Sequence, residues 1–182
     1  MASYPAPHVV EDMRPFLQLL SDGTVIRFPD YNPLPSPSPP PGQPVVEWKD
    51  AVYDAGHNLK LRVYKPPADS SGEKLPVLAY LHGGRYFMGS FEMPNFHAFC
   101  LRLAGEIPAV VLSADYHLAP EHRLPAALND AATFLSWVRG ESADPWLADS
   151  ADFVSSLEQA REKVFVQPEL SCFSVSLALF IL

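Results

Sequence analysis

Cysteine is scarce in this chain, where Cys100 and Cys172 are the two among 182 residues. Their positions form neither a disulfide framework nor the paired spacing of a metal site, which is typical of a protein from a reducing compartment. Long apolar runs are also missing, because none approaches the roughly 20 residues that a helix needs to cross a bilayer. The sequence therefore predicts no disulfide framework, no cysteine metal site and no membrane span.

Basic residues are outnumbered, with 13 Lys and Arg against 21 Asp and Glu and a net charge of −8. No basic stripe is visible, which argues against a nucleic acid or an anionic membrane as the partner. The first residues, MASYPAPHVVEDM, have neither the basic region nor the apolar region of a secretory signal. With 48% apolar and 19% charged residues, we expect a globular cytoplasmic protein, with the nucleus as a second location.

The most informative stretch is a short apolar run that ends in two glycines. Leu75–Leu81 reads as a buried strand, and His82, Gly83 and Gly84 follow it directly. Paired glycines let the backbone turn sharply and bring bare N–H groups close to a ligand. Such N–H groups stabilise the oxyanion of acyl transfer, although a plain Gly-Gly turn would look the same over three residues.

The chain before this strand contains two hairpin signals separated by a proline-rich segment. Phe16–Phe28 places two apolar runs around Asp22-Gly23, a pair typical of hairpins. Half of the residues in Pro29–Pro44 are proline, which predicts an extended linker, and a motif for proline-binding domains is the alternative. Val45–Tyr53 and Leu59–Tyr64 then predict the second hairpin.

Strands and helices alternate after the glycines. Pro94–Gly105 has apolar residues at helical spacing and ends at a glycine, and Leu124–Val138 repeats this periodicity. Ile107–Ala114 is a continuous apolar run typical of a strand covered on both faces, and Lys163–Val166 begins one more strand. This order predicts an α/β fold with hairpins first, then a mostly parallel sheet flanked by helices.

Two long motifs carry a resemblance to a known family. HGGRYFMGS, from His82 to Ser90, and DYHLAPEHRLPAA, Asp115–Ala127, together resemble the carboxylesterase branch of the α/β-hydrolases related to hormone-sensitive lipase. Val9–Phe28 is similar to the N-terminus of the plant carboxylesterases, a group that includes the gibberellin receptors. Two residues depart from the family pattern: Arg85 stands where a glycine or another small residue is usual, and His117 replaces an arginine.

The resemblance implies a serine hydrolase of carboxylic esters that needs no metal and no cofactor. It assigns the oxyanion hole to Gly83 and Gly84, and Arg85 would narrow or charge the acyl pocket beside them. We expect His82 to stabilise this loop rather than to act as a general base, because it precedes the glycines. Asp115 and Tyr116 follow a strand at the edge where such folds place their sites, and we interpret them as a brace, with direct catalysis as the alternative.

The sequence has no counterpart of the catalytic serine of the family. The family presents its serine on a G-x-S-x-G turn, but Gly140 is the last glycine here. If Val164–Val166 is the strand before that turn, the motif falls on Pro168–Cys172, with Leu170 in the place of the serine. Ser171 or Cys172 would need an activating histidine, and every histidine precedes residue 123. We therefore expect a truncated form that lacks the Ser, Asp and His of the triad and is inactive by itself.

The predicted organisation has three parts. Residues 1–44 form a lid-like segment with the proline-rich linker, 45–166 a partial α/β-hydrolase domain, and 167–182 an apolar tail unlike the family. The first alternative to an esterase is a non-catalytic binding protein of the gibberellin-receptor type. The second alternative is a fragment that pairs with relatives through an open sheet edge. The expected ligand is accordingly a small ester or a hormone-like molecule.

Overall fold

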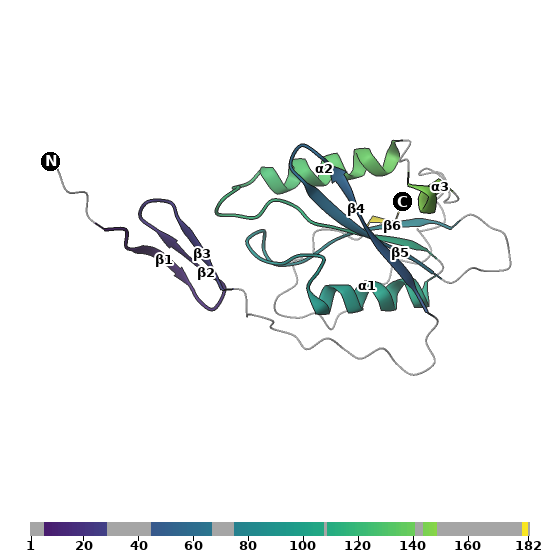
Figure 1. Cartoon of the computed structure of the whole chain (residues 1–182), viewed down its shortest axis with the longest axis horizontal. Coiled ribbons are helices and arrows are strands. Elements are labelled where there is room, and N and C mark those ends of the chain that lie inside the picture. Colours follow the sequence, from purple (N-terminus) through teal and green to yellow (C-terminus); the bar gives the residue numbers. More distant parts are fainter. Residues whose placement is uncertain are drawn as a thin grey trace.

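The computed structural model describes residues 6–28, 45–66, 75–107, 109–140, 144–148 and 180–181. The whole proline-rich segment Pro29–Pro44 lies outside these ranges, as do the expected strand at Val164–Val166 and the residues Pro168–Cys172. Within them the chain forms a small N-terminal sheet and a larger sheet flanked by helices (Figure 1).

The N-terminal sheet consists of three antiparallel strands in the order β1-β2-β3. The strands are β1 (Val9–Met13), β2 (Leu17–Leu20) and β3 (Val25–Arg27). The predicted hairpin is the β2–β3 pair, and its turn is closed by Thr24 N, which donates to Asp22 Oδ1 at 3.0 Å. Strand β1 was not predicted, because four of its five residues are exposed and leave no apolar alternation to detect.

The larger sheet has the strand order β4-β5-β7-β6-β8. Its strands are β4 (Glu47–Asp54), β5 (Leu59–Lys65), β6 (Val77–Leu81), β7 (Val110–Ala114) and β8 (Phe180–Ile181). The β6–β7 pair is parallel, whereas β4–β5, β5–β7 and β6–β8 are antiparallel. Within the described residues the sheet is therefore mixed rather than mostly parallel as predicted, because β5 of the hairpin pairs directly with β7. In the parallel pair Leu81 lies opposite Ala114, so the segments that follow both strands leave the sheet at the same edge.

Three helices accompany this sheet: α1 (Pro94–Glu106), α2 (Ala126–Arg139) and the short α3 (Pro145–Ala148). Figure 1 shows α1 on one face of the sheet and α2 on the other. Helix α1 runs past the predicted end at Gly105, since its C-cap is Ile107, whose N–H donates to Leu103 O at 2.9 Å. Helix α2 begins after Pro125, close to the predicted start.

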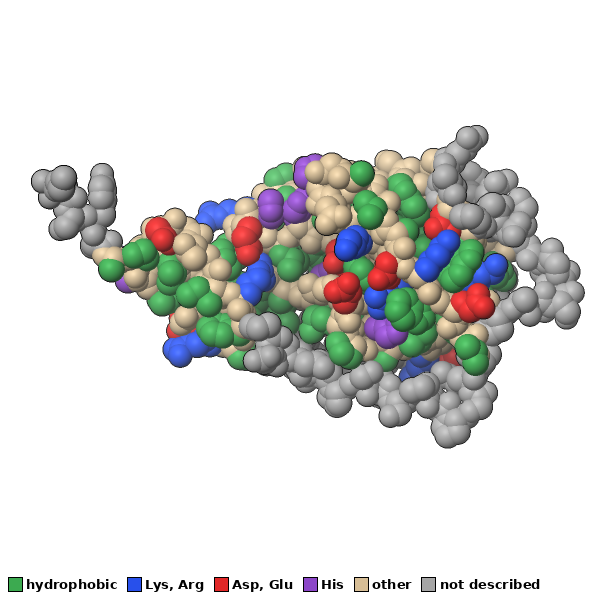
Figure 2. Space-filling view, in the orientation of Figure 1, with side chains coloured by type: hydrophobic (Ala, Val, Ile, Leu, Met, Phe, Trp, Pro, Cys, Tyr) green, Lys and Arg blue, Asp and Glu red, His purple; other side chains and the backbone are tan. Residues whose placement is uncertain are grey.

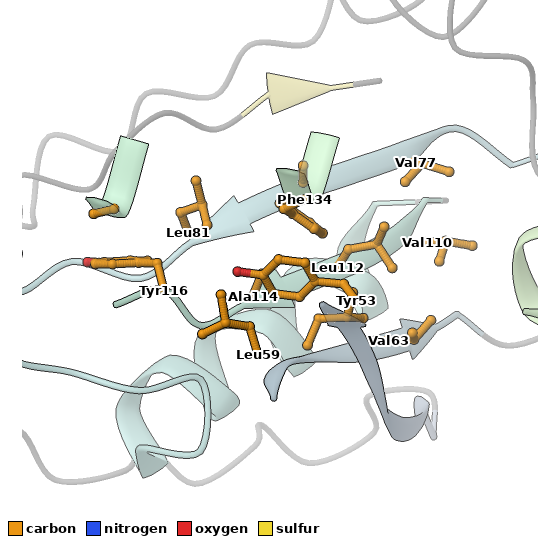
Figure 3. Packing of buried hydrophobic residues seen from close by; sticks show 13 residues of the cluster. Tyr53, Leu59, Val63, Val77, Leu81, Val110, Leu112, Ala114, Tyr116 and Phe134 are labelled. Atoms are coloured by element: carbon orange, nitrogen blue, oxygen red, sulfur yellow. The ribbon is translucent and has the colours of Figure 1, made fainter. Parts of the chain in front are cut away.

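Alternation along the strands divides the core into two layers. Figure 3 shows the first layer, in which the side chains between the sheet and α2 include Leu61, Val63, Val77, Ala79, Leu81, Leu112, Ala114 and Phe134. The second layer, against α1, includes Tyr64, Leu78, Tyr80, Cys100, Ala104 and Val111. Burial raises the pKa of the Cys100 thiol to about 12, so it remains a neutral apolar group of this core.

Candidate functional site

The loop after β6 makes a tight turn that begins at Gly84. The Gly84 carbonyl accepts hydrogen bonds from Phe87 N at 3.1 Å and from Met88 N at 3.2 Å. Gly84 has a φ of +129°, and a Cβ built on it would lie 1.9 Å from the Met88 carbonyl oxygen. Only glycine fits there, because L-residues avoid this φ and the nearest atom belongs to the backbone.

The amides of Gly83 and Gly84 are buried donors without a protein acceptor among the described residues. Their carbonyls, in contrast, are used: Gly84 O by the turn and Gly83 O by His82 Nδ1, which donates at 2.9 Å. Buried backbone N–H groups are nearly always paired. Two adjacent unpaired donors at the end of a strand are therefore suited to a water molecule or the oxygen of a ligand.

His82 lies under this loop and is only 1% exposed. Its ring stacks on Tyr116, with 4.4 Å between the ring centroids and 15° between the planes. Its Nε2 lies 3.4 Å from Asp115 Oδ1, within ion-pair distance but without hydrogen-bond geometry. The His82 ring is therefore enclosed by the loop and by the segment after β7.

Asp115 and Tyr116 connect the segment after β7 to the glycine loop. Asp115 Oδ1 accepts a hydrogen bond from Phe91 N at 2.8 Å, and Oδ2 accepts one from Ser90 Oγ at 3.3 Å. The Tyr116 hydroxyl donates to His82 O at 2.8 Å. Burial raises the pKa of Tyr116, so its hydroxyl keeps the proton that it donates.

Arg85 is the candidate residue that the structure does not bring to this cluster. It is exposed and has no hydrogen bond to His82, Asp115 or Tyr116 among the described residues. Its φ of 52° and that of Tyr86, 65°, fall in the left-handed region that favours glycine. This backbone conformation explains why a glycine suits the position of Arg85.

The second departure from the family pattern, His117, connects its loop to α2. Its backbone N and its Nδ1 both donate to Asp130 Oδ2, at 2.7 and 2.8 Å. Its ring centroid lies 4.2 Å from that of His122 and 5.2 Å from that of His57. Histidine side chains gather at one edge of the molecule in Figure 2. The imidazole thus contacts the carboxylate of Asp130 on α2.

Two residues that the sequence did not point to also contact these loops. Tyr53 of β4 donates its hydroxyl proton to Asp115 O at 2.7 Å. Arg27 of β3 donates from Nη1 to Phe87 O at 2.6 Å and from Nη2 to Ala119 O at 2.8 Å. These three contacts span 60 to 92 residues of sequence, and local periodicity carries no signal for such distant pairs.

Neither a metal centre nor a membrane helix is found within the described ranges. No group of three or more His, Cys, Asp or Glu side chains there is arranged to hold a metal ion. None of the helices in that part of the chain combines the length and the apolar character that crossing a bilayer requires. The candidate site therefore consists of backbone donors and the side chains that support them.

Comparison with known proteins identifies the family. The family described as alpha/beta hydrolase fold matches residues 78–166, a range that contains the glycine loop, Asp115 and Tyr116. The chain has the α/β-hydrolase fold. Both the predicted fold class and the predicted resemblance to plant carboxylesterases are confirmed.

Two similar plant proteins are carboxylesterases by name. Probable carboxylesterase 8 of Arabidopsis thaliana is 35% identical over 158 residues, which cover 81% of this chain and 46% of that protein. Carboxylesterase 20 of the same plant is 36% identical over 162 residues, with 83% and 48% covered. The crystal structure of DphMB1 is 32% identical with a TM-score of 0.50, covering 61% of this chain and 34% of that one. The chain thus spans less than half of the length of each.

The predicted cytoplasmic location is wrong in the light of other relatives. Tuliposide A-converting enzyme 2 of Tulipa gesneriana is named chloroplastic and is 35% identical over 150 residues, covering 80% of this chain and 38% of that protein. Tuliposide A-converting enzyme b1 of the same plant is named amyloplastic. The names of similar α/β-hydrolases therefore point to a plastid, which composition alone could not indicate.

Proposed function

We propose that this chain supplies the oxyanion-binding part of a carboxylesterase that acts on small carboxylic esters. In such a reaction a serine hydroxyl loses its proton to a base and attacks the ester carbonyl, and the carbonyl oxygen becomes an anion. The alcohol then leaves, and water hydrolyses the acyl-enzyme. The observation that carries the proposal is the pair of buried, unpaired amides of Gly83 and Gly84 at the end of β6.

In this proposal the neighbouring side chains have supporting roles. His82 and Tyr116 fix the strand end from which the amides project, through the ring stack and the 2.8 Å hydrogen bond to His82 O. Asp115 holds the far end of the loop through Phe91 N. Arg85 is exposed and has no assigned role in this proposal. Each donor of an oxyanion hole contributes roughly a hundredfold to a thousandfold in rate.

We further propose that these 182 residues do not turn over esters by themselves. Within them no glycine follows Gly140, and Leu170 takes the place of the family serine if Val164–Val166 is the strand before the turn. Loss of a triad nucleophile costs on the order of a millionfold in rate, which oxyanion donors cannot offset. The proposed division is a lid-like segment and linker at 1–44, a partial hydrolase domain at 45–166 and an apolar tail at 167–182. The hormone-binding alternative gains no support from relatives named as carboxylesterases and tuliposide-converting enzymes.

The test of the missing nucleophile uses the 182-residue chain with p-nitrophenyl acetate and a fluorophosphonate probe. We expect neither covalent labelling nor a burst of p-nitrophenol. Labelling of a serine would contradict the proposal, as would a hydrolysis rate that disappears in S171A or C172A.

The test of the oxyanion role joins residues 1–166, the end of the family match, to the remaining C-terminal part of Carboxylesterase 20. We expect this chimera to hydrolyse p-nitrophenyl acetate and the G84A variant of the chimera to lose at least a hundredfold in kcat. G23A is the matched control, because its added Cβ meets no atom within 4 Å. An active chimera in which G84A and G23A are equally fast would refute the role of Gly84.

A further inference from the structure

Arg27 joins three segments that are far apart in the sequence. Its Nη1 donates to Phe87 O at 2.6 Å and its Nη2 to Ala119 O at 2.8 Å. Its Nε and Nη2 also donate to the two carboxylate oxygens of Glu121, at 2.9 and 2.6 Å. We propose that Arg27 is a positioning residue that fixes the glycine loop and holds the N-terminal sheet against it, an inference that rests on the proposed function.

The first step of the argument is the place of Phe87 in the loop. Its N–H donates to Gly84 O and closes the turn, while its carbonyl accepts from Arg27. The same peptide segment is held a second time, because Ala119 N donates to Tyr86 O at 2.7 Å and Ala119 O accepts from Arg27. Arg27 therefore restrains the turn directly at Phe87 and, through Ala119, at Tyr86.

The second step concerns the N-terminal sheet. Arg27 is the last residue of β3, and the ring of Phe16, just before β2, meets the ring of Phe87 edge to face at 5.8 Å between centroids. Phe28 N donates to Phe16 O at 3.0 Å, so these contacts come from one corner of the small sheet. The glycine loop and the N-terminal sheet are thus coupled through Phe87, and displacement of one displaces the other.

The third step is a comparison with an ordinary surface pair. Arg14 of the same sheet segment pairs with Asp12 two residues away and is 67% exposed, whereas the side chain of Arg27 is 35% exposed. An exposed ion pair between near neighbours in sequence contributes little to folding stability. Arg27 instead satisfies two loop carbonyls and a carboxylate at once with one rigid, planar group, a geometry that the ammonium of lysine cannot reproduce. The Arg27 hydrogen bonds also lower the pKa of Glu121 and keep it charged.

The experiment is residue-level hydrogen exchange on the 182-residue chain. In R27A we expect the amides of Phe87, Met88 and Ala119 to exchange about 10 to 100 times faster, the range for lost hydrogen bonds to a charged group. The β6 and β7 amides should keep their rates. R14A is the matched control and should leave the loop unchanged.

Two further variants separate positioning from a simple ion pair. R27K keeps the charge beside Glu121 but not the geometry, so we expect the loop amides to remain fast. E121Q keeps both carbonyl contacts, and we expect a smaller acceleration of the same amides. Unchanged loop rates in R27A, full recovery in R27K, or equal acceleration throughout β6 and β7 would each overturn the proposal. Hydrogen exchange requires no ester turnover. The exchange rates therefore test the role of Arg27 even if the proposed esterase chemistry fails.

Discussion

Replacement of Gly84 by alanine tests the tightest point of the candidate site. The new Cβ would lie 1.9 Å from the Met88 carbonyl oxygen and 2.8 Å from its carbonyl carbon. Both are backbone atoms, so no side-chain rotation can relieve the contact. The φ of +129° is also strained for any L-residue. We therefore expect the turn to open rather than to accommodate the methyl group.

The magnitude follows from these two contributions. Strain at such a φ costs about 1–3 kcal/mol. Opening the turn also loses the hydrogen bonds of Phe87 N and Met88 N to Gly84 O, each worth about 1 kcal/mol. We expect G84A to lower the free energy of unfolding by about 4 kcal/mol in total. Gly23 has a φ of +87° and no atom within 4 Å of an added Cβ, so G23A should lower the free energy of unfolding by the strain contribution alone.

Urea denaturation followed by tryptophan fluorescence measures both variants. The difference between them isolates the steric contact with Met88, because both glycines have a positive φ. We expect G84A to shift the midpoint at least twice as far as G23A, at an unchanged slope against urea. Equal shifts would refute the reasoning, since they would mean that the loop yields to the methyl group without losing its hydrogen bonds.

Three further predictions use the same denaturation assay. Y116F removes the 2.8 Å hydrogen bond to the buried His82 carbonyl and should lower the free energy of unfolding by about 1–3 kcal/mol. Y86F is the control, and equal losses in the two variants would contradict a stabilising role for this hydrogen bond. R85G should stabilise the chain by up to about 1 kcal/mol because Arg85 sits at a φ of 52°, and a loss of stability would contradict this. The hydrogen bond to Asp54 raises the pKa of His57. The contribution of this hydrogen bond to the free energy of unfolding is therefore fully present below the ordinary pKa of 6.5 and is lost as pH rises through the raised pKa. H57Q should abolish this pH dependence of stability. An unchanged dependence of stability on pH in H57Q would show that His57 is not its source.

Much of the fold was predictable because its strands are short, apolar and bounded by turns. Val77–Leu81 and Val110–Ala114 are buried throughout, and continuous apolar runs revealed both of them. Two long motifs predicted the family, which the match over residues 78–166 confirms. The end of α1 was misplaced at Gly105, because the helix continues to Glu106 and uses Ile107 as its cap. A glycine inside a helix is tolerated where tertiary packing holds the neighbouring turns.

The contacts that support the candidate site were less predictable than its glycines. Arg27 follows a hairpin turn in the sequence, and nothing local distinguishes it from Arg14. The two differ only in the folded chain, where Arg27 reaches residues 60 and 92 positions away. The hydroxyl of Tyr53 acts over 62 positions in the same way. Such pairs depend on topology, which periodicity and motif spacing leave open.

The register of the parallel pair has a consequence for how such chains can vary in length. Leu81 faces Ala114, so His82 and Asp115 leave the sheet as neighbours whatever number of residues connects the two strands. Insertions around α1 would lengthen the crossover and leave both segments in place, because the ladder sets their alignment. One residue added inside β6 or β7 would instead turn every following side chain to the opposite face. The sheet therefore tolerates a change in the spacing between the two motifs better than a change in the length of either strand.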